Sequence, residues 1–158
     1  LLGCRADTPR VRSLCARIGA FVVDDAAQAC GVVTDQGVLG TLGDVGIYSF
    51  SRGKLLSGVH GGAVVTRSPE LAAALHREES ALSEPGWLAT AALFAQAAAL
   101  WLFLDPRRYW IPAALPFLGL GETVYDTMFA MQRMSGLAAG LMANASRRLA
   151  QGTTSRLA

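Results

Sequence analysis

The chain has 158 residues, of which 52% are hydrophobic and 16% are charged, and its formal net charge is +2. This composition excludes a disordered chain, and so small a charge gives no reason to expect a nucleic-acid partner. Three cysteines without a CxxC spacing favour a reducing compartment and argue against a disulfide framework or a zinc site.

The two ends of the chain lack the signals of a complete protein. It begins with Leu1, its first methionine is Met128, and no basic region followed by an apolar run marks a secretory signal. We therefore expect an internal piece of a longer, cytoplasmic protein. The alternative is a complete small domain, because single domains of this length are common.

The first predicted helix begins at Asp7, a capping residue, has Pro9 in its first turn and ends at Gly19. Its apolar residues recur at helical spacing and form one face: Val11, Leu14, Cys15 and Ile18. Residues 20–23 form a continuous apolar run, which is typical of a strand buried on both faces. A helix, a short turn and a buried strand make half of a βαβ unit.

Further elements follow in chain order. Residues 35–37 form a turn signal, residues 45–50 and 62–66 are predicted strands, and a helix is expected from Ser68 to about Glu79. Residues 1–84 are therefore predicted to form the later part of an α/β domain with a mostly parallel sheet.

The stretch from Trp87 to Leu104 is almost wholly apolar, with Thr90 and Gln96 as its only polar residues. Its length is the lower bound for a bilayer span, but seven of its residues are alanine. We interpret it as an alanine-rich helix, or two short ones, in the core or at a subunit interface. The alternative is membrane insertion or interfacial attachment, since aromatic residues lie near its ends: Trp87, Trp101, Tyr109 and Trp110.

Residues 112–121 are punctuated by proline and glycine and are expected to be a linker. A helix is predicted from Met128 to about Gln151, with an apolar stripe that favours the core over a cofactor site: Met131, Met134, Leu137 and Leu141. The predicted organisation is a large-domain part at 1–84, an apolar segment and linker at 85–115, and the start of a smaller domain at 116–158.

Lys54 is the only lysine of the chain and directly follows Gly53, soon after a predicted strand. Arginine cannot replace an amine that must lose its proton and attack a carbonyl. We therefore interpret Lys54 as the residue that binds pyridoxal phosphate through a Schiff base. Taken alone, a single lysine is more often a solvated surface charge.

Pyridoxal phosphate also needs a carboxylate beside its ring nitrogen and donors for its phosphate. Asp25 lies at the carboxyl end of a predicted strand, Ser49 is five residues before Lys54, and Gln28 can bond the ring hydroxyl. Asp24 is the competing acid, and only one of the two should reach the ring, because neighbouring strand residues face opposite sides. Four glycines would let the backbone pass close to the cofactor: Gly53, Gly58, Gly61 and Gly62.

Three runs of sequence carry a family resemblance: VVDDAAQA at 22–29, GTLGDVGIYSF at 40–50 with Lys54 after it, and GGAVVT at 61–66. In this order they closely resemble the DegT/DnrJ/StrS family of pyridoxal-phosphate-dependent sugar aminotransferases. The resemblance covers residues 1 to about 80. A looser likeness at 118–123 and in the methionine-rich helix is similar to the family's passage into its smaller C-terminal domain.

The resemblance implies a fold-type I aminotransferase in which Lys54 is the catalytic Schiff-base lysine and proton shuttle. It implies Asp25 as the partner of the ring nitrogen, Gln28 near the ring hydroxyl and Ser49 as a phosphate ligand. It also implies transfer of an amino group, from glutamate, to a nucleotide-linked keto-sugar in polysaccharide biosynthesis by a homodimer. Related sugar dehydratases have histidine in place of this lysine, so Lys54 favours transamination. The phosphate loop and ring-stacking residue are expected upstream.

Three features depart from the family pattern. Leu55 stands where asparagine is usual, His60 stands where an acidic residue is usual, and the stretch from Trp87 to Leu104 is not a general feature. We expect His60 to make a structural or dimer contact, not to act as an acid-base group. Two other functions remain open: a non-catalytic or regulatory relative, and a membrane-associated protein of glycan assembly whose contact is this apolar stretch.

Overall fold

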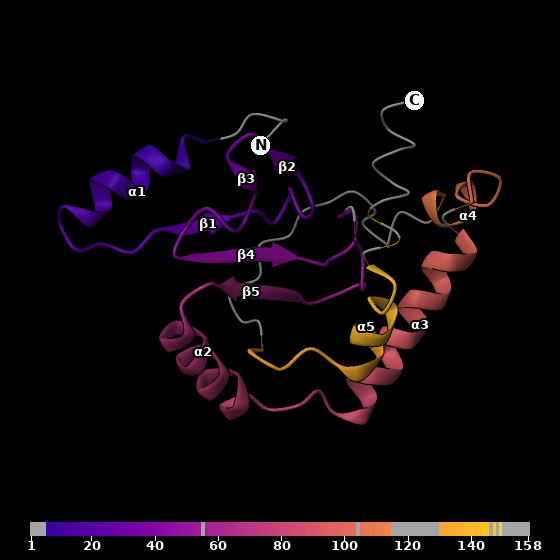
Figure 1. Ribbon diagram of the computed structural model, residues 1–158. Helices are drawn as coiled ribbons and strands as arrows, with labels where there is room; N and C mark the ends of the chain where they lie inside the picture. Colours follow the sequence, from indigo (N-terminus) through magenta and orange to yellow (C-terminus); the bar gives the residue numbers. More distant parts are fainter. Residues whose placement is uncertain are drawn as a thin grey trace.

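The computed structural model describes residues 6–54, 56–103, 105–114 and 130–145, together with residues 147 and 149 (Figure 1). Its elements are α1 (Thr8–Ala16), β1 (Val23–Asp25), β2 (Val33–Thr34), β3 (Gly37–Val38), β4 (Val45–Ser49), β5 (Gly62–Thr66), α2 (Pro69–Ala81), α3 (Trp87–Phe103), α4 (Trp110–Ala113) and α5 (Gly136–Leu141). In Figure 1, α2 lies beside β5, while α3 and α5 pack together beyond one end of the sheet.

The main sheet has the strand order β1-β4-β5. β1 and β4 are parallel, as expected, with Asp25 opposite Ile47. β5 runs antiparallel to β4, so the prediction of a mostly parallel sheet is wrong for this pair. The physical reason is the short return between the two strands: the amide of Phe50 donates to the carbonyl of Gly61 over 2.9 Å, and the described residues of the connection form no helix that would carry the chain back.

The turn predicted at residues 35–37 is confirmed as the tip of the small β2–β3 hairpin. The hydroxyl of Thr34 donates to the carbonyl of Gly37 over 2.9 Å. Gly37 has φ +125°, a conformation that residues with a Cβ rarely adopt.

The predicted starts of α1 and α2 are both confirmed by their caps. The Asp7 carboxylate accepts from the amide of Arg10 over 3.2 Å, and the Ser68 hydroxyl accepts from the amide of Leu71 over 3.2 Å. Each helix has proline in its first turn. These starts were predictable because a cap depends only on residues one turn apart.

The burial expected for residues 20–23 is confirmed for Val22 and wrong for Phe21, which is exposed. Val11 and Leu14, on the apolar face of α1, are also exposed. The first strand starts at Val23, not at residue 20, because its ladder with β4 starts where Val23 faces Val45. The side chain of Val23 is 56% exposed, since no described element covers that face of the sheet.

The apolar cluster of the described residues lies away from the sheet, where the chain between β4 and β5 meets α3 and α5. It is formed by Val59, Leu93 and Ala138, with Ala97, Leu100, Met134 and Leu137 packed around them. Val59 has φ +71° and is the only described non-glycine residue with positive φ. Packing against α3 and α5 therefore holds the loop before β5 in a conformation that a β-branched residue disfavours.

The helix expected from Met128 to Gln151 is wrong over residues 130–135. α5 begins only after Ser135, whose hydroxyl accepts from the amide of Ala138 over 3.2 Å. The preceding residues run alongside the end of α2, where the amide of Arg133 donates to the carbonyl of Ser83. Met131 and Leu141 are exposed, so only Met134 and Leu137 of the expected stripe pack against the apolar cluster.

The apolar stretch after residue 85 forms α3, a single helix, as one of the two expected forms. No helix in the described ranges is long and apolar enough to cross a membrane. The linker predicted at 112–121 starts within the helical turn α4, and its remaining part, from 115 onward, lies outside the described residues, as do 116–129 of the predicted smaller domain. The proposed domain boundaries stay a prediction.

Candidate active site

The register of the sheet sorts the predicted site residues onto two faces. Asp25 lies opposite Ile47 in the parallel pair, so both residues project from the same face, and Ser49 follows two residues further along β4 on that face. Asp24 lies opposite Gly46 and projects from the other face. Asp25 and Ser49 are therefore brought to the same edge and the same side of the sheet.

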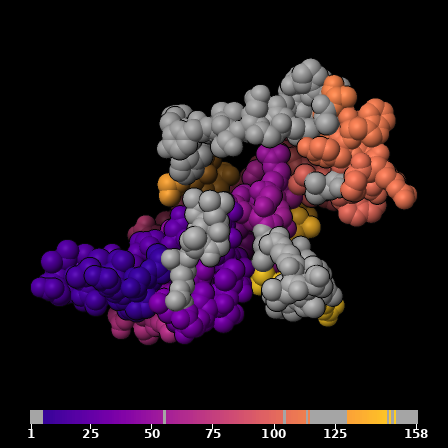
Figure 2. Space-filling model, turned by 90° about the horizontal axis from the view of Figure 1, so that it is seen from above, coloured from indigo at the N-terminus to yellow at the C-terminus, as the bar shows by residue number. Residues whose placement is uncertain are grey.

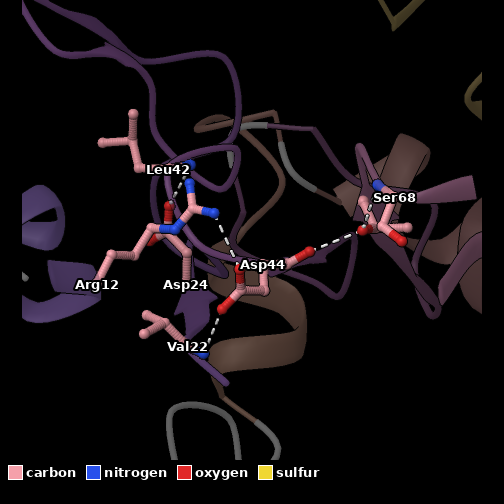
Figure 3. A network of polar contacts seen from close by, with 7 residues as sticks. Arg12, Val22, Asp24, Leu42, Asp44 and Ser68 are labelled. Atoms are coloured by element: carbon pink, nitrogen blue, oxygen red, sulfur yellow. Dashed lines mark hydrogen bonds and ion pairs between the residues drawn. The ribbon is translucent and has the colours of Figure 1, made fainter. Parts of the chain in front are cut away.

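The loop before β4 covers the face of the sheet from which Asp24 projects, here called the Asp24 face. One carboxylate oxygen of Asp24, Oδ2, accepts from the amide of Gly40 over 2.7 Å. The same oxygen accepts from the amide of Leu42 over 3.2 Å (Figure 3). The loop lies so close that a Cβ on Gly46 would run into the carbonyl of Gly40. Asp24 is thus used to fold the chain and is not free to meet a ligand on the opposite face.

Tyr48 also holds the loop over this face of the sheet. Its phenol donates to the carbonyl of Leu39 over 2.6 Å. Burial raises the pKa of Tyr48, and the nearby Cys30 and Asp24 raise it further. Burial also raises the pKa of the Cys30 thiol. Both groups therefore stay protonated at neutral pH, and the phenol keeps the proton that it donates.

Asp44 ties the same loop to the helices on either side of the sheet. Its carboxylate accepts from the amide of Val22 over 2.8 Å and pairs with Arg12 over 3.0 Å (Figure 3). Its carbonyl accepts from the hydroxyl of Thr66 over 2.7 Å, and that hydroxyl accepts from the amide of Ser68 over 3.2 Å. One residue therefore joins α1, β1, the end of β5 and the cap of α2.

Sequence reasoning missed the structural roles of Asp24, Asp44 and Tyr48. All three lie inside the motifs at 22–29 and 40–50, so the signal was present. The motifs were interpreted as ligand-binding, whereas these members hold the loop on the sheet.

The Asp25 face is open. The Asp25 side chain is exposed, and its Oδ1 accepts from the amide of Ala27 over 3.0 Å. The apolar side chains around it on this face are also exposed: Val23, Ile47 and Val64. This single local bond orients the carboxylate and leaves its second oxygen without a partner among the described residues.

Ser49 ends β4 as one of a pair of hydroxyls. Its Oγ lies 3.0 Å from Oγ of Ser51, and the amide of Ser51 approaches the same oxygen at 3.4 Å. Both serines are half-buried. Ser51 was not among the predicted site residues, although its two-residue spacing from Ser49 could have suggested it. The pair offers hydroxyl donors at the carboxyl edge of the sheet.

Lys54 closes a tight turn directly after this pair. Its amide donates to the carbonyl of Ser51 over 3.3 Å, and Gly53 takes φ +80° within the turn. The side chain is half-buried and forms no ion pair with another described residue. The loop then returns to β4, where the amide of Gly58 donates to the carbonyl of Phe50 over 2.8 Å.

Gln28 lies in the turn that follows Asp25, where the amide of Ala29 donates to the carbonyl of Ala26 over 2.9 Å. Its side chain is exposed and bonds no other described residue. Gln28 is therefore placed next to Asp25 in the chain, at the same end of β1.

The glycines near Lys54 serve the chain's own packing. A Cβ on Gly58 would approach the carbonyl of Ala138 at 3.2 Å, and one on Gly62 would meet the carbonyl of Tyr48 at 2.5 Å. A Cβ on Gly61 would meet the sulfur of Met134 at 3.0 Å. Packing within the described residues accounts for these three glycines, and the expected approach to a cofactor stays a prediction.

His60 makes the structural contact that was expected for it. Its Nε2 lies 2.9 Å from Oε1 of Gln96, one of the two polar side chains of α3. His60 also borders a cleft of about 450 Å³, whose other polar lining comes from Gln132, Arg133 and Ser135. Within the described residues, no group of acids, histidines and cysteines could hold a metal ion.

The family model that describes DegT/DnrJ/EryC1/StrS aminotransferases matches residues 1–94. The chain belongs to this family. The match covers both motifs, Lys54 and the start of α3. It confirms the resemblance that the motifs indicated, and with it membership of a family of pyridoxal-phosphate-dependent enzymes.

Curated relatives match the same part of the chain. A UDP-N-acetyl-3-dehydro-alpha-D-glucosamine 3-aminotransferase of Acidithiobacillus ferrooxidans is 42% identical over 73 residues, which are 45% of this chain and 20% of the relative. An L-glutamine:2-deoxy-scyllo-inosose aminotransferase of Streptomyces kanamyceticus is 37% identical over 67 residues, 42% of this chain and 16% of the relative. The matched part thus spans about a fifth of these relatives or less.

Solved structures agree on the fold. A DegT DnrJ EryC1 StrS aminotransferase from Brucella abortus superposes with a TM-score of 0.57 at 25% identity, over 96% of this chain and 31% of that protein. An aminotransferase from Psychrobacter cryohalolentis gives a TM-score of 0.58 at 17% identity, over 93% of this chain and 31% of that protein, and supports the fold alone. The chain therefore has an α/β fold that corresponds to about a third of these aminotransferases.

Proposed function

We propose that this chain carries the lysine-bearing part of the active site of a pyridoxal-phosphate-dependent sugar aminotransferase. The reaction moves an amino group from glutamate to a nucleotide-linked keto-sugar in polysaccharide biosynthesis. The observation that carries the proposal is the placement of Asp25 and Ser49 on one open face, at the sheet edge from which the turn to Lys54 departs.

The residues on this face fit pyridoxal phosphate by their chemistry. Asp25 offers a carboxylate with one oxygen unused, and Ser49 and Ser51 offer hydroxyls for a phosphate. Lys54 offers an amine without an ion-pair partner among the described residues. Asp24, the competing acid, is engaged by two backbone amides on the other side of the sheet.

Each residue then has a distinct task. Asp25 would hold a proton on the ring nitrogen of the bound group, and Ser49 and Gln28 would contact its phosphate and its ring hydroxyl. The amine of Lys54 would attach the group covalently and, when free, would move a proton to and from the substrate carbon. When bound, pyridoxal phosphate supplies an electron sink for the carbanion that this proton transfer creates.

The relatives guide the choice of substrates. Their names describe an aminated nucleotide sugar in one case and an aminated inosose with L-glutamine as donor in the other. We therefore propose a cyclic keto-substrate, with a nucleotide-linked sugar preferred, and glutamate as donor with glutamine as the second choice. We further propose a homodimer that acts in the cytoplasm.

The test uses the full-length protein that contains this chain. Borohydride should trap pyridoxal phosphate on wild type, and a peptide containing Lys54 should carry the label. Lys54→Ala should abolish both the label and the release of 2-oxoglutarate from glutamate, with a rate loss of at least about a thousandfold because the nucleophile and the proton shuttle disappear together.

Lys54→Arg is the matched control, since it keeps the charge but lacks an amine that can be deprotonated. It should be as inactive as Lys54→Ala. A trapped adduct that persists in either variant contradicts the role of Lys54. An intact adduct without turnover on any keto-sugar and either donor would instead support the non-catalytic relative.

A further inference from the structure

Helix α3 has one face packed on the protein and, beside it, an apolar face that is exposed. Leu93, Ala97 and Leu100 lie in or against the cluster around Val59 and Ala138. About 90° around the helix from these residues, Trp87, Phe94 and Trp101 are 77%, 63% and 84% exposed. A helix that is apolar all round is normally covered all round.

The three aromatic residues are spaced by seven, so they project within about 40° of one another along the helix axis. Trp87 and Trp101 are about 21 Å apart along that axis. Trp110 of α4 is 67% exposed and lies just beyond the same end as Trp101. We name Trp87, Phe94, Trp101 and Trp110 the aromatic ridge; it contains every tryptophan of the chain.

The polar side chains of α3 do not disturb the ridge. The hydroxyl of Thr90 donates to the carbonyl of Gly86 over 3.2 Å, and the amide oxygen of Gln96 lies 2.9 Å from Nε2 of His60. The hydroxyl of Thr90 and the amide oxygen of Gln96 are thus bonded within the protein. Gln96 projects from the side of the helix away from the ridge, so the ridge can enter an apolar medium without burying the amide of this side chain.

Charge distinguishes the two ends of the ridge. Arg107 and Arg108 are exposed between Trp101 and Trp110 and form no ion pair with a described residue. Asp105, the acid beside them, uses its carboxylate to accept from the amide of Arg107 over 2.8 Å. At the other end, Glu84 is paired with Arg133 over 3.0 Å.

We propose that the aromatic ridge docks this protein on the surface of an anionic lipid bilayer, with α3 lying in the plane of the membrane. Tryptophan is enriched at the membrane–water interface, and the ridge sets its aromatic rings along one line. The two arginines complement anionic headgroups at the same level. In Figure 2 the α3–α4 segment, coloured salmon to orange, lies at one end of the molecule.

The inference goes beyond the proposed transamination, because the ridge lies outside the Asp25 face and none of its residues has a role in the chemistry. The apolar stretch at residues 87–104, which departs from the family pattern, thereby gains a function. It would hold the enzyme at a membrane surface.

The experiment measures binding of the full-length protein to vesicles of phosphatidylcholine alone and of phosphatidylcholine with 30% phosphatidylglycerol. We expect sedimentation with the anionic vesicles, a blue shift of tryptophan emission, and quenching by brominated lipids. The variant Trp87→Ser/Phe94→Ser/Trp101→Ser should lose at least about tenfold in the partition coefficient.

Arg107→Gln/Arg108→Gln keeps the ridge and tests the charges. It should lose about tenfold on anionic vesicles and change little on neutral ones. Arg10→Gln/Arg17→Gln, on the exposed side of α1, is the matched control and should bind as wild type does. Thermal melting and transaminase activity in solution verify that each variant is folded.

Wild type that stays in the supernatant with both vesicle types overturns the proposal. So does vesicle binding that the serine variant retains. If wild type ignores vesicles while the serine variant lowers the sedimentation coefficient in ultracentrifugation, the ridge is an interface with a second copy or another subunit, and the bilayer is rejected.

Discussion

Asp24 and Asp25 are consecutive residues of β1, yet their surroundings differ. Asp24 is held by the amides of Gly40 and Leu42 and forms part of the packing of the loop. Asp25 makes one local bond and faces an open side of the sheet. The comparison shows that one sequence motif can contain residues that hold the fold around a site and residues that stay available to a ligand.

The same division runs through β4. Gly46 and Tyr48 point to the closed side, where they fit against the loop, while Ile47 and Ser49 point to the open side. The alternation of a strand therefore assigns the members of the motif at 40–50 to two tasks. Variants on the closed face should change stability, and variants on the open face should change activity.

The largest effect on stability is expected at Gly46. In Gly46→Ala the new methyl group meets the backbone carbonyl of Gly40, which cannot turn aside as a side chain could. The free energy of unfolding should fall by about 3 kcal/mol or more, measured by chemical denaturation. Gly86→Ala, at a glycine with open space around it, is the control and should change little. Equal stability of the two variants would contradict the tight fit of the loop.

A smaller effect is expected from the serine pair, on the open face. Ser49→Ala should weaken pyridoxal-phosphate affinity about tenfold, because a phosphate loses one hydrogen bond from a well-placed hydroxyl. Ser51→Ala should weaken it less, since Ser51 acts on the phosphate mainly by orienting Ser49. Fluorescence titration of the apoenzyme measures both. A larger loss in Ser51→Ala would reverse the two roles.

The smallest effect on stability is expected from the segment before α5, outside these two faces. Its Arg133 bonds Glu79 of α2 over 2.9 Å, and this bond, together with the arginine charge, lowers the pKa of Glu79. A lowered carboxyl pKa adds stability above the usual titration range of glutamate, and that stability is lost as the pH falls through the folded-state value.

Arg133→Gln should therefore lower the melting temperature by roughly 1–2 °C at pH 7, because both side chains are partly exposed and screened. The difference from wild type should shrink as the pH is lowered below the ordinary range of glutamate. Arg147→Gln provides a comparison without this ion pair. A difference that grows on acidification would show that the Glu79 pair is not its source.

The sequence predicted features that depend on near neighbours. The caps at Asp7 and Ser68, the limits of β5 and the helix from Trp87 follow from residues within a turn or a strand. It did not predict the direction of β5, which depends on the backbone path between the strands. The α5 start was missed because the apolar spacing from Met131 suggested a helix that begins earlier, and the capping residue Ser135 was not recognised.

The candidate site was predictable in composition but not in arrangement. The motifs named Lys54, Asp25, Gln28 and Ser49, and the alternation of a strand anticipated that only one acid would face the ligand side. The use of Asp24 and Asp44 by distant backbone amides could not be inferred, because it depends on which loop lies over which face.

The most direct test compares Asp24→Asn with Asp25→Asn in the full-length enzyme, since the two changes are chemically identical and adjacent. We expect Asp25→Asn to keep wild-type stability while kcat falls at least about a hundredfold, as the proton on the ring nitrogen loses its partner. Asp24→Asn should keep kcat per folded molecule and lose about 1–3 kcal/mol of unfolding free energy. The reverse result, activity lost in Asp24→Asn and stability lost in Asp25→Asn, would contradict the division of the two faces.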